Sequence, residues 1–211
     1  MVFSMLEIPT SSNNNVVAHT TRKLARPSVW RAAAVAFPFI VVVVSLLFGA
    51  SYFLTTFLGL PFSLSLSLEL RVVGGMVVVV GLSVMGWVFS HRSPANMMVS
   101  TYVTFTKMFR RAPFAEMAGR TEPLIIDGPQ RYARNPLYFG VVMMVFGWAL
   151  VSANTFVFVA TLALFLWFRV FLIPFEEREL QALFGDQWKR YSEETPMLIP
   201  FTKGRARRRG P

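Results

Sequence analysis

The sequence has no cysteine and only two histidines, His19 and His91, among its 211 residues. It therefore cannot form a disulfide, a thiolate nucleophile or a cysteine-ligated metal site, and the scarcity of histidine argues against a histidine-based zinc or haem centre. Charged residues are also few: they make up 15% of the chain, against about 25% in a typical soluble domain. We therefore expect no metal cofactor and no ordinary soluble fold.

Apolar residues dominate instead. They make up 54% of the chain, including 21 Phe, and the mean hydropathy is +0.50. A small soluble domain leaves much of its surface in water and could not bury so many apolar side chains. The predicted class is an all-α polytopic membrane protein, because a chain in lipid must satisfy its backbone hydrogen bonds internally. About four transmembrane helices are expected, over residues 32–58, 72–89, 137–151 and 155–175.

The last two spans are predicted to form a helical hairpin. Residues 137–175 are almost continuously apolar, whereas one crossing of the hydrocarbon needs only about 20 residues. The polar run at residues 152–155 is the natural break, and Asn154 is suited to cap the returning helix. Residues 97–111 and 186–191 mix apolar and basic side chains and are expected to form amphipathic cytosolic segments.

The distribution of positive charge predicts the orientation. The formal net charge is +10, and Lys and Arg number four up to Arg31, seven in the 90–136 loop and eight after residue 175. The 59–71 loop holds only Arg71. Because Lys and Arg gather in cytosolic loops, both termini and the 90–136 loop are expected to be cytosolic. Topology and contact with membrane lipid thus explain the positive charge without nucleic acid.

The chain is predicted to have one membrane domain, over residues 29–202, flanked by two tails. Residues 1–28 are polar and are expected to be a mobile cytosolic tail, and residues 203–211 form a basic tail. The 90–136 loop is long for a bare connection and is therefore a candidate functional segment.

A first polar cluster lies directly before the third span. Residues 128–140 read GPQRYARNPLYFG, with Asn135 placed as the cap of a helix that starts at the following proline. Arg134 then lies beside free backbone N–H groups, a geometry that suits an anion. Tyr138 and Gly140 fall in the first turn, and Gly140 leaves room for a ligand or a close helix. The alternative is a capped helix start with arginines that only extend to the membrane surface.

A second cluster combines Arg169, inside the fourth span, with Glu176 and Glu177 at its end. The spacings place these charges on one helix face, and charges inside spans usually face a cavity or a partner. The alternative is that the glutamates are solvated among lipid headgroups. A ligand that uses both clusters needs an anion, a cation and a flat group; S-adenosylmethionine has all three, and a phosphate-bearing nicotinamide cofactor would also suit the arginines.

Residues 128–200 resemble the signature region of the integral-membrane methyltransferases that include isoprenylcysteine carboxyl methyltransferase and the phospholipid N-methyltransferases. The resemblance is carried by the 128–140 block, the helical hairpin and the glutamate pair, followed by Phe184-Gly185, Tyr191 and the Pro-Met-Leu-Ile-Pro run that ends at residue 200. It implies S-adenosylmethionine as methyl donor and a lipophilic acceptor that arrives from the bilayer. It also implies a cofactor site made of Tyr132, Arg134, Asn135, Tyr138, Gly140, Glu176 and Glu177.

The chain departs from the family pattern at two positions. Asn135 stands where many members have histidine, and Gln130 stands where an aromatic residue is usual. For catalysis, Glu177 or Glu176 is a candidate to help deprotonate an amine acceptor. Arg169 is a candidate either to orient an acceptor carboxylate or to pair with Glu176.

The function expected from the sequence is S-adenosylmethionine-dependent methyl transfer, at the cytosolic membrane face, to an acceptor that resembles an isoprenylcysteine carboxylate or a phospholipid. The chemistry of the acceptor, whether carboxylate, amine, phenol or thiol, stays open. The alternatives are an NADPH-dependent enzyme of the sterol-reductase type and a non-catalytic four-helix scaffold. None of these three candidate functions requires a metal.

Overall fold

The computed structural model describes residues 28–110 and 124–202, and the regular secondary structure of this part of the chain is helical, apart from one isolated bridge between Ser63 and Asn154. The predicted all-α class is therefore confirmed. The predicted tails, residues 1–28 and 203–211, lie outside the described residues except for residue 28. The helices are α1 (Val29–Phe57), α2 (Leu68–His91), α3 (Pro94–Arg110), α4 (Pro136–Ser152), α5 (Thr155–Trp167) and α6 (Ile173–Glu194), with a 3₁₀ turn, η1 (Gly128–Arg131), and a π turn, η2 (Phe168–Leu172).

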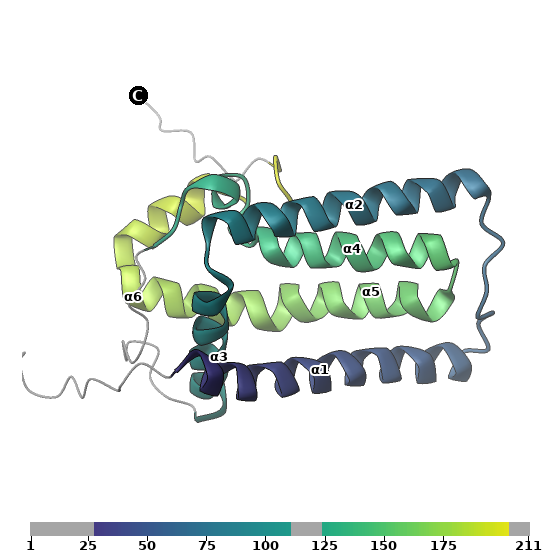
Figure 1. Cartoon of the computed structure of the whole chain (residues 1–211), viewed down its shortest axis with the longest axis horizontal. Coiled ribbons are helices and arrows are strands. Elements are labelled where there is room, and N and C mark those ends of the chain that lie inside the picture. Colours follow the sequence, from purple (N-terminus) through teal and green to yellow (C-terminus); the bar gives the residue numbers. More distant parts are fainter. Residues whose placement is uncertain (1–27, 111–123, 203–211) are drawn as a thin grey trace, which may run out of the picture.

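Four helices, α1, α2, α4 and α5, run side by side (Figure 1). Three helical stretches are long and apolar enough to cross a membrane, Val29–Phe57, Leu68–His91 and Thr155–Glu194, and Pro136–Ser152 is a shorter apolar helix. The start of α1, the end of α2 and the start of α4 lie at the same end of the bundle (Figure 1). This up-and-down path is the one that the predicted topology requires.

The hairpin between α4 and α5 turns where the sequence predicts. Ala153 adopts a left-handed conformation with φ 52°, and the Asn154 side chain accepts a hydrogen bond of 3.1 Å from the backbone N–H of Phe156. The connection between α1 and α2 packs on this turn, because the N–H of Leu64 donates to the carbonyl of Ala153 over 2.8 Å. Arg71 lies at the same end and donates to the carbonyl of Val151 over 2.9 Å.

Glycines bring α2 and α4 into backbone contact. A Cβ added to Gly81 would lie 2.7 Å from the carbonyl oxygen of Gly140, and a Cβ added to Gly74 would lie 2.8 Å from that of Gly147. The glycines are seven residues apart on both helices, so each antiparallel pair meets on the same face two turns on. Small residues allow this close approach in membrane helices, where packing rather than the hydrophobic effect holds helices together.

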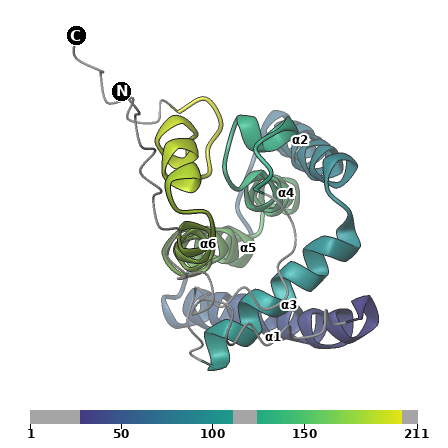
Figure 2. The same ribbon diagram turned by 90° about the vertical axis from the view of Figure 1, so that its left-hand side faces the viewer.

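The helix α3 crosses the bundle at the end where α4 begins, passing near α1 (Figure 2). Ala32 and Ala36 of α1 are fully buried at this end, and so is Val99 of α3. Beyond α5 the core continues through Leu172 and Ile173 to Leu198 near the C-terminus. The segment after α6 therefore folds back onto the bundle and brings residues close to the start of α4.

Candidate active site

The site is built around the turn that precedes α4. Gly128 opens η1 with φ +60°, and a Cβ at this position would lie 2.4 Å from the His91 ring, so only glycine fits. Pro129 and Gln130 are buried beneath the turn. The hydroxyl of Tyr191 donates to the backbone carbonyl of Gln130 over 2.7 Å, which fixes η1 against the far end of α6.

The segment after α6 supports the start of α4 from the other side. The N–H of Arg134 donates to the carbonyl of Pro196 over 2.9 Å, and the Asn135 amide donates to the carbonyl of Met197 over 3.0 Å. Asn135 occupies the predicted cap position, but its side chain makes no capping hydrogen bond to α4. The predicted cap position is therefore confirmed, while the side chain makes its hydrogen bond to a segment 62 residues further along the chain.

The two adjacent glutamates have different partners. Glu176 accepts a hydrogen bond from the Tyr138 hydroxyl over 2.7 Å. Glu177 forms an ion pair with Arg134 at 3.0 Å, with both side chains mostly buried. Neighbouring residues on a helix point about 100° apart, so a single glutamate could not serve both partners. The pair therefore ties α6 both to α4, at Tyr138, and to the turn before it, at Arg134.

The π turn η2 and Gly185 shape the helix that carries these glutamates. The turn ends at Leu172, two residues before Pro174, and π turns inside helices are frequent at functional sites. Gly185 breaks α6 with φ 49° and ψ −120°. Beyond the break Trp188 is buried, and its ring centre lies 5.8 Å from the guanidinium carbon of Arg134.

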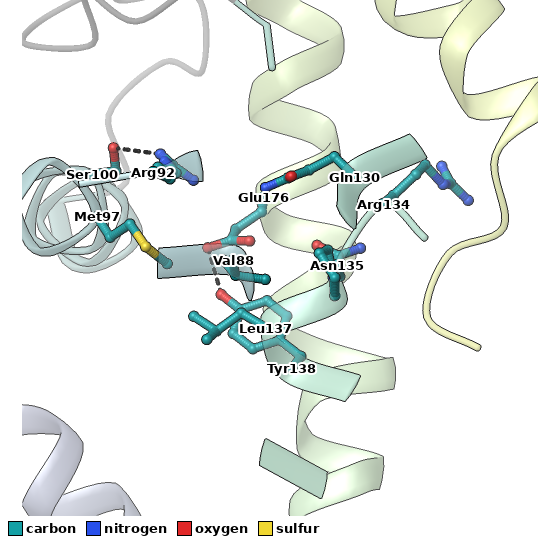
Figure 3. A pocket seen from close by; sticks show the side chains of 11 residues that line it. Val88, Arg92, Met97, Ser100, Gln130, Arg134, Asn135, Leu137, Tyr138 and Glu176 are labelled. Atoms are coloured by element: carbon teal, nitrogen blue, oxygen red, sulfur yellow. Dashed lines mark hydrogen bonds between the residues drawn. The ribbon is translucent and has the colours of Figure 1, made fainter. Parts of the chain in front are cut away.

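Two polar cavities adjoin this cluster, with volumes of about 90 and 80 Å³. Figure 3 shows the side chains around the first of them, with the hydrogen bonds Tyr138–Glu176 and Arg92–Ser100 drawn. The first cavity also reaches Met97 of α3, and the second reaches the aromatic residues Phe184, Trp188 and Tyr191. The residues common to both cavities are Arg92, Gln130, Arg134, Asn135 and Glu176.

A third cavity, of about 440 Å³, is almost entirely apolar and lies between α1, α4 and α5. It shares Leu137, Tyr138 and Glu176 with the first polar cavity. The Tyr138–Glu176 hydrogen bond thus lies where the polar and apolar spaces meet. The apolar residues around it are Phe39, Ile40, Val43, Val44, Leu47, Phe48, Val141, Met144, Val145, Leu164, Trp167, Phe168 and Leu172.

The structure gathers four of the predicted cofactor-site residues around the polar cavities: Arg134, Asn135, Tyr138 and Glu176. Glu177 is the ion-pair partner of Arg134. Tyr132 is largely exposed and lies against Trp87 and Phe201, with ring centres 5.7 and 5.6 Å away.

The other two predicted site residues face elsewhere. Gly140 faces α2. Of the two roles expected for it, room for a ligand or close packing of a helix, the structure shows the close packing of a helix. Arg169 is exposed on η2 and is not among the residues that line these three cavities. The catalytic roles of Arg169 and Glu177 stay predictions.

Several lining residues were missed by the sequence analysis. Arg92 and Ser100 come from the 90–136 loop, which was marked only as a candidate segment; the Arg92 guanidinium donates to the Ser100 hydroxyl over 3.1 Å. Trp188 lies in a segment interpreted as amphipathic. Gln130 was noted as a departure from the family pattern and carried no assigned role. Across residues 28–110 and 124–202, no cluster of side chains suited to hold a metal ion is present.

The comparisons with known proteins concern this same region. Residues 112–187 match the phospholipid methyltransferase family. The chain is 29% identical over 73 residues to methanethiol S-methyltransferase 1 of Bradyrhizobium diazoefficiens, covering 35% of this chain and 25% of that protein. It is 30% identical over 71 residues to methanethiol S-methyltransferase of Crocosphaera subtropica, covering 34% of this chain and 27% of that protein. No solved structure matches the chain significantly.

These matches confirm the resemblance drawn from the sequence: the region is similar to the phospholipid methyltransferase family and to two methyltransferases. The aligned part spans about a quarter of the length of either relative. The family match includes η1, α4, the hairpin, the glutamate pair and Gly185. The apolar cavity also uses α1, which lies outside the matched residues.

Proposed function

We propose that this protein transfers a methyl group from S-adenosylmethionine to a lipophilic acceptor at the cytosolic face of a membrane. The observation that carries the proposal is the junction at Tyr138 and Glu176, where polar cavities meet an apolar one. A charged donor on one side and an apolar acceptor on the other would then meet at a single point. Family membership of residues 112–187 supports the same chemistry.

The residues around the polar cavities fit such a donor. Arg134 offers a buried Nε that has no hydrogen-bond partner among the described residues, which suits the donor's carboxylate. Glu176 provides a carboxylate beside the cavity for the ammonium or sulfonium. The buried ring of Trp188 offers a flat apolar surface for the adenine. Each cavity is smaller than the whole donor, so we expect binding to widen them.

S-adenosylmethionine supplies a methyl carbon already activated by its sulfonium, so the protein's main task is to align donor and acceptor. Arg134, held by Glu177, would orient the donor. Tyr138 and Glu176 would bound the passage through which the acceptor group approaches the methyl carbon. A carboxylate or thiolate acceptor needs no base, whereas an amine must lose a proton, and Glu176 is the carboxylate at the boundary of both spaces.

The apolar cavity favours an acceptor with a hydrocarbon chain. Its wall is formed by aliphatic and aromatic side chains from α1, α4 and α5, and Tyr138 and Glu176 supply its polar edge. A chain buried there would gain the usual free energy of apolar burial while its head reached the junction. The second candidate acceptor is a thiol, because the two curated relatives are named for methanethiol.

Equilibrium binding tests the donor. The full chain in lipid nanodiscs is titrated with radiolabelled S-adenosylmethionine, with unlabelled NADPH as competitor. We expect saturable binding that NADPH does not displace and that Glu176→Gln weakens at least about 10-fold. The matched control is Glu193→Gln, an exposed glutamate of the same helix, which should bind as wild type. Binding of NADPH alone would favour a reductase, and binding of neither ligand would favour a non-catalytic scaffold.

A further inference from the structure

The side chain of Gln130 has a feature that neither the fold nor the family resemblance explains. Gln130 is 8% exposed, and its Oε1 is buried with no hydrogen-bond partner among the described residues. A buried carbonyl without a partner destabilises the folded state, since it has lost its water and gained nothing. Buried polar groups are therefore nearly always paired, and the exceptions call for a specific reason.

Geometry places this amide in the centre of the polar space. Gln130 belongs to both polar cavities, one with Tyr138 at its edge and the other with Trp188. Figure 3 shows its side chain reaching from η1 toward Glu176. The backbone beneath it is fixed, because the Tyr191 hydroxyl donates to the Gln130 carbonyl over 2.7 Å. The amide is thus held in place at the point that both cavities share.

We propose that Gln130 binds the methyl donor directly, with its side-chain oxygen accepting a hydrogen bond from a ribose hydroxyl. The inference rests on the proposed function, since it requires a nucleoside donor in these cavities. A donor that fills both cavities has its amino-acid end on the Tyr138 side and its adenine on the Trp188 side. The ribose joins these ends and carries two hydroxyl donors, and it would pass Gln130.

A structural role and a binding role predict opposite results for Gln130→Met, which keeps nearly the same volume but removes the amide. If the amide served the fold, its loss would lower the melting temperature. If it serves the ligand, the unliganded protein should melt no lower than wild type, because an unpaired buried carbonyl has been removed. The affinity for ligand should fall instead. The matched control is Gln187→Met, the same change at an exposed position of α6.

The experiment is calorimetric titration of the full chain in nanodiscs with S-adenosylhomocysteine and with its 2′-deoxy and 3′-deoxy analogues. We expect Gln130→Met to bind S-adenosylhomocysteine about 10-fold more weakly than wild type, the usual effect of losing one good hydrogen bond. For one of the deoxy analogues, wild type should bind it about 10-fold more weakly than it binds S-adenosylhomocysteine. Gln130→Met should bind that analogue and S-adenosylhomocysteine with equal affinity. The two losses would then be non-additive, as for partners in direct contact.

Three results would overturn the inference. The first is unchanged affinity of Gln130→Met for S-adenosylhomocysteine. The second is a melting temperature several degrees below wild type without ligand. The third is that removing either ribose hydroxyl lowers the affinity of Gln130→Met as much as it lowers that of wild type. The side chain and the hydroxyl would then not be coupled. Failure of the proposed function looks different, because wild-type protein itself would then not bind S-adenosylhomocysteine.

Discussion

Replacing Gly81 by alanine tests the contact that positions the site. The added Cβ would lie 2.7 Å from both the Gly140 carbonyl oxygen and the Met144 nitrogen. These are backbone atoms, so no side-chain rotation can relieve the overlap. An ordinary carbon–oxygen contact is about 3.4 Å, and α2 and α4 would have to separate by roughly 0.7 Å to reach it. Because Tyr138 lies in the first turn of α4, the same shift would disturb the junction of the cavities.

The expected loss of stability in Gly81→Ala follows from a comparison with Gly75, six residues earlier on α2. A Cβ at Gly75 meets no atom within 4 Å. Both substitutions remove the same backbone flexibility and add the same helix preference, which is worth up to about 1 kcal/mol in favour of alanine. Overpacking costs about 1–3 kcal/mol and applies only at Gly81. The difference in the free energy of unfolding between the two variants should therefore be about 1–3 kcal/mol.

Thermal unfolding in a mild detergent, followed by the intrinsic fluorescence of tryptophan, measures this difference. Gly75→Ala should melt at or above the wild-type temperature, and Gly81→Ala several degrees below Gly75→Ala. Methyl transfer should fall in Gly81→Ala, since displacement of about 1 Å at a catalytic junction is costly. Equal melting temperatures for the two variants would refute the close packing of α2 on α4.

Three further outcomes are expected. Tyr138→Phe removes the hydroxyl that bonds Glu176 and should lower stability by about 1 kcal/mol while reducing methyl transfer at least about 10-fold, measured by unfolding and by label transfer. Gly185→Ala forces a Cβ onto a backbone with φ 49° and ψ −120° and should lower the free energy of unfolding by about 1–3 kcal/mol, although no atom lies within 4 Å of that Cβ. Arg134→Ala leaves Glu177 without its ion-pair partner and should weaken binding of S-adenosylhomocysteine at least 10-fold, or about 1.4 kcal/mol, by titration.

The helices and the hairpin could be predicted because lipid permits little else. An apolar stretch without water must bond its own backbone, so the spans predicted over residues 32–58 and 72–89 correspond to the helices α1 and α2. The turn at Asn154 was predictable because its signal is local: one capping side chain within a short polar stretch, residues 152–155, of a long apolar run.

The site was harder to predict because its partners are distant in sequence. Asn135 lies at the predicted cap position, yet its amide N–H donates to the carbonyl of Met197, and no local pattern indicates a partner 62 residues away. Gly140 was compatible with a ligand or a helix, and only the position of Gly81 decides between them. The burial of Gln130 also depends on how α6 returns after its break. Sequence could name the polar residues but not which of them face the same space.

The direct test of the account is transfer of label from S-[methyl-³H]adenosylmethionine by the full chain in nanodiscs made with phospholipid and supplied with a prenylcysteine or a thiol. The reaction is separated into a lipid extract, protein and a volatile fraction. The account predicts label in the lipid extract with wild type and with Glu193→Gln, and a loss of at least about 10-fold with Glu176→Gln. Label in the volatile fraction alone would contradict the hydrocarbon-chain acceptor, and label in none of the fractions would contradict methyl transfer itself.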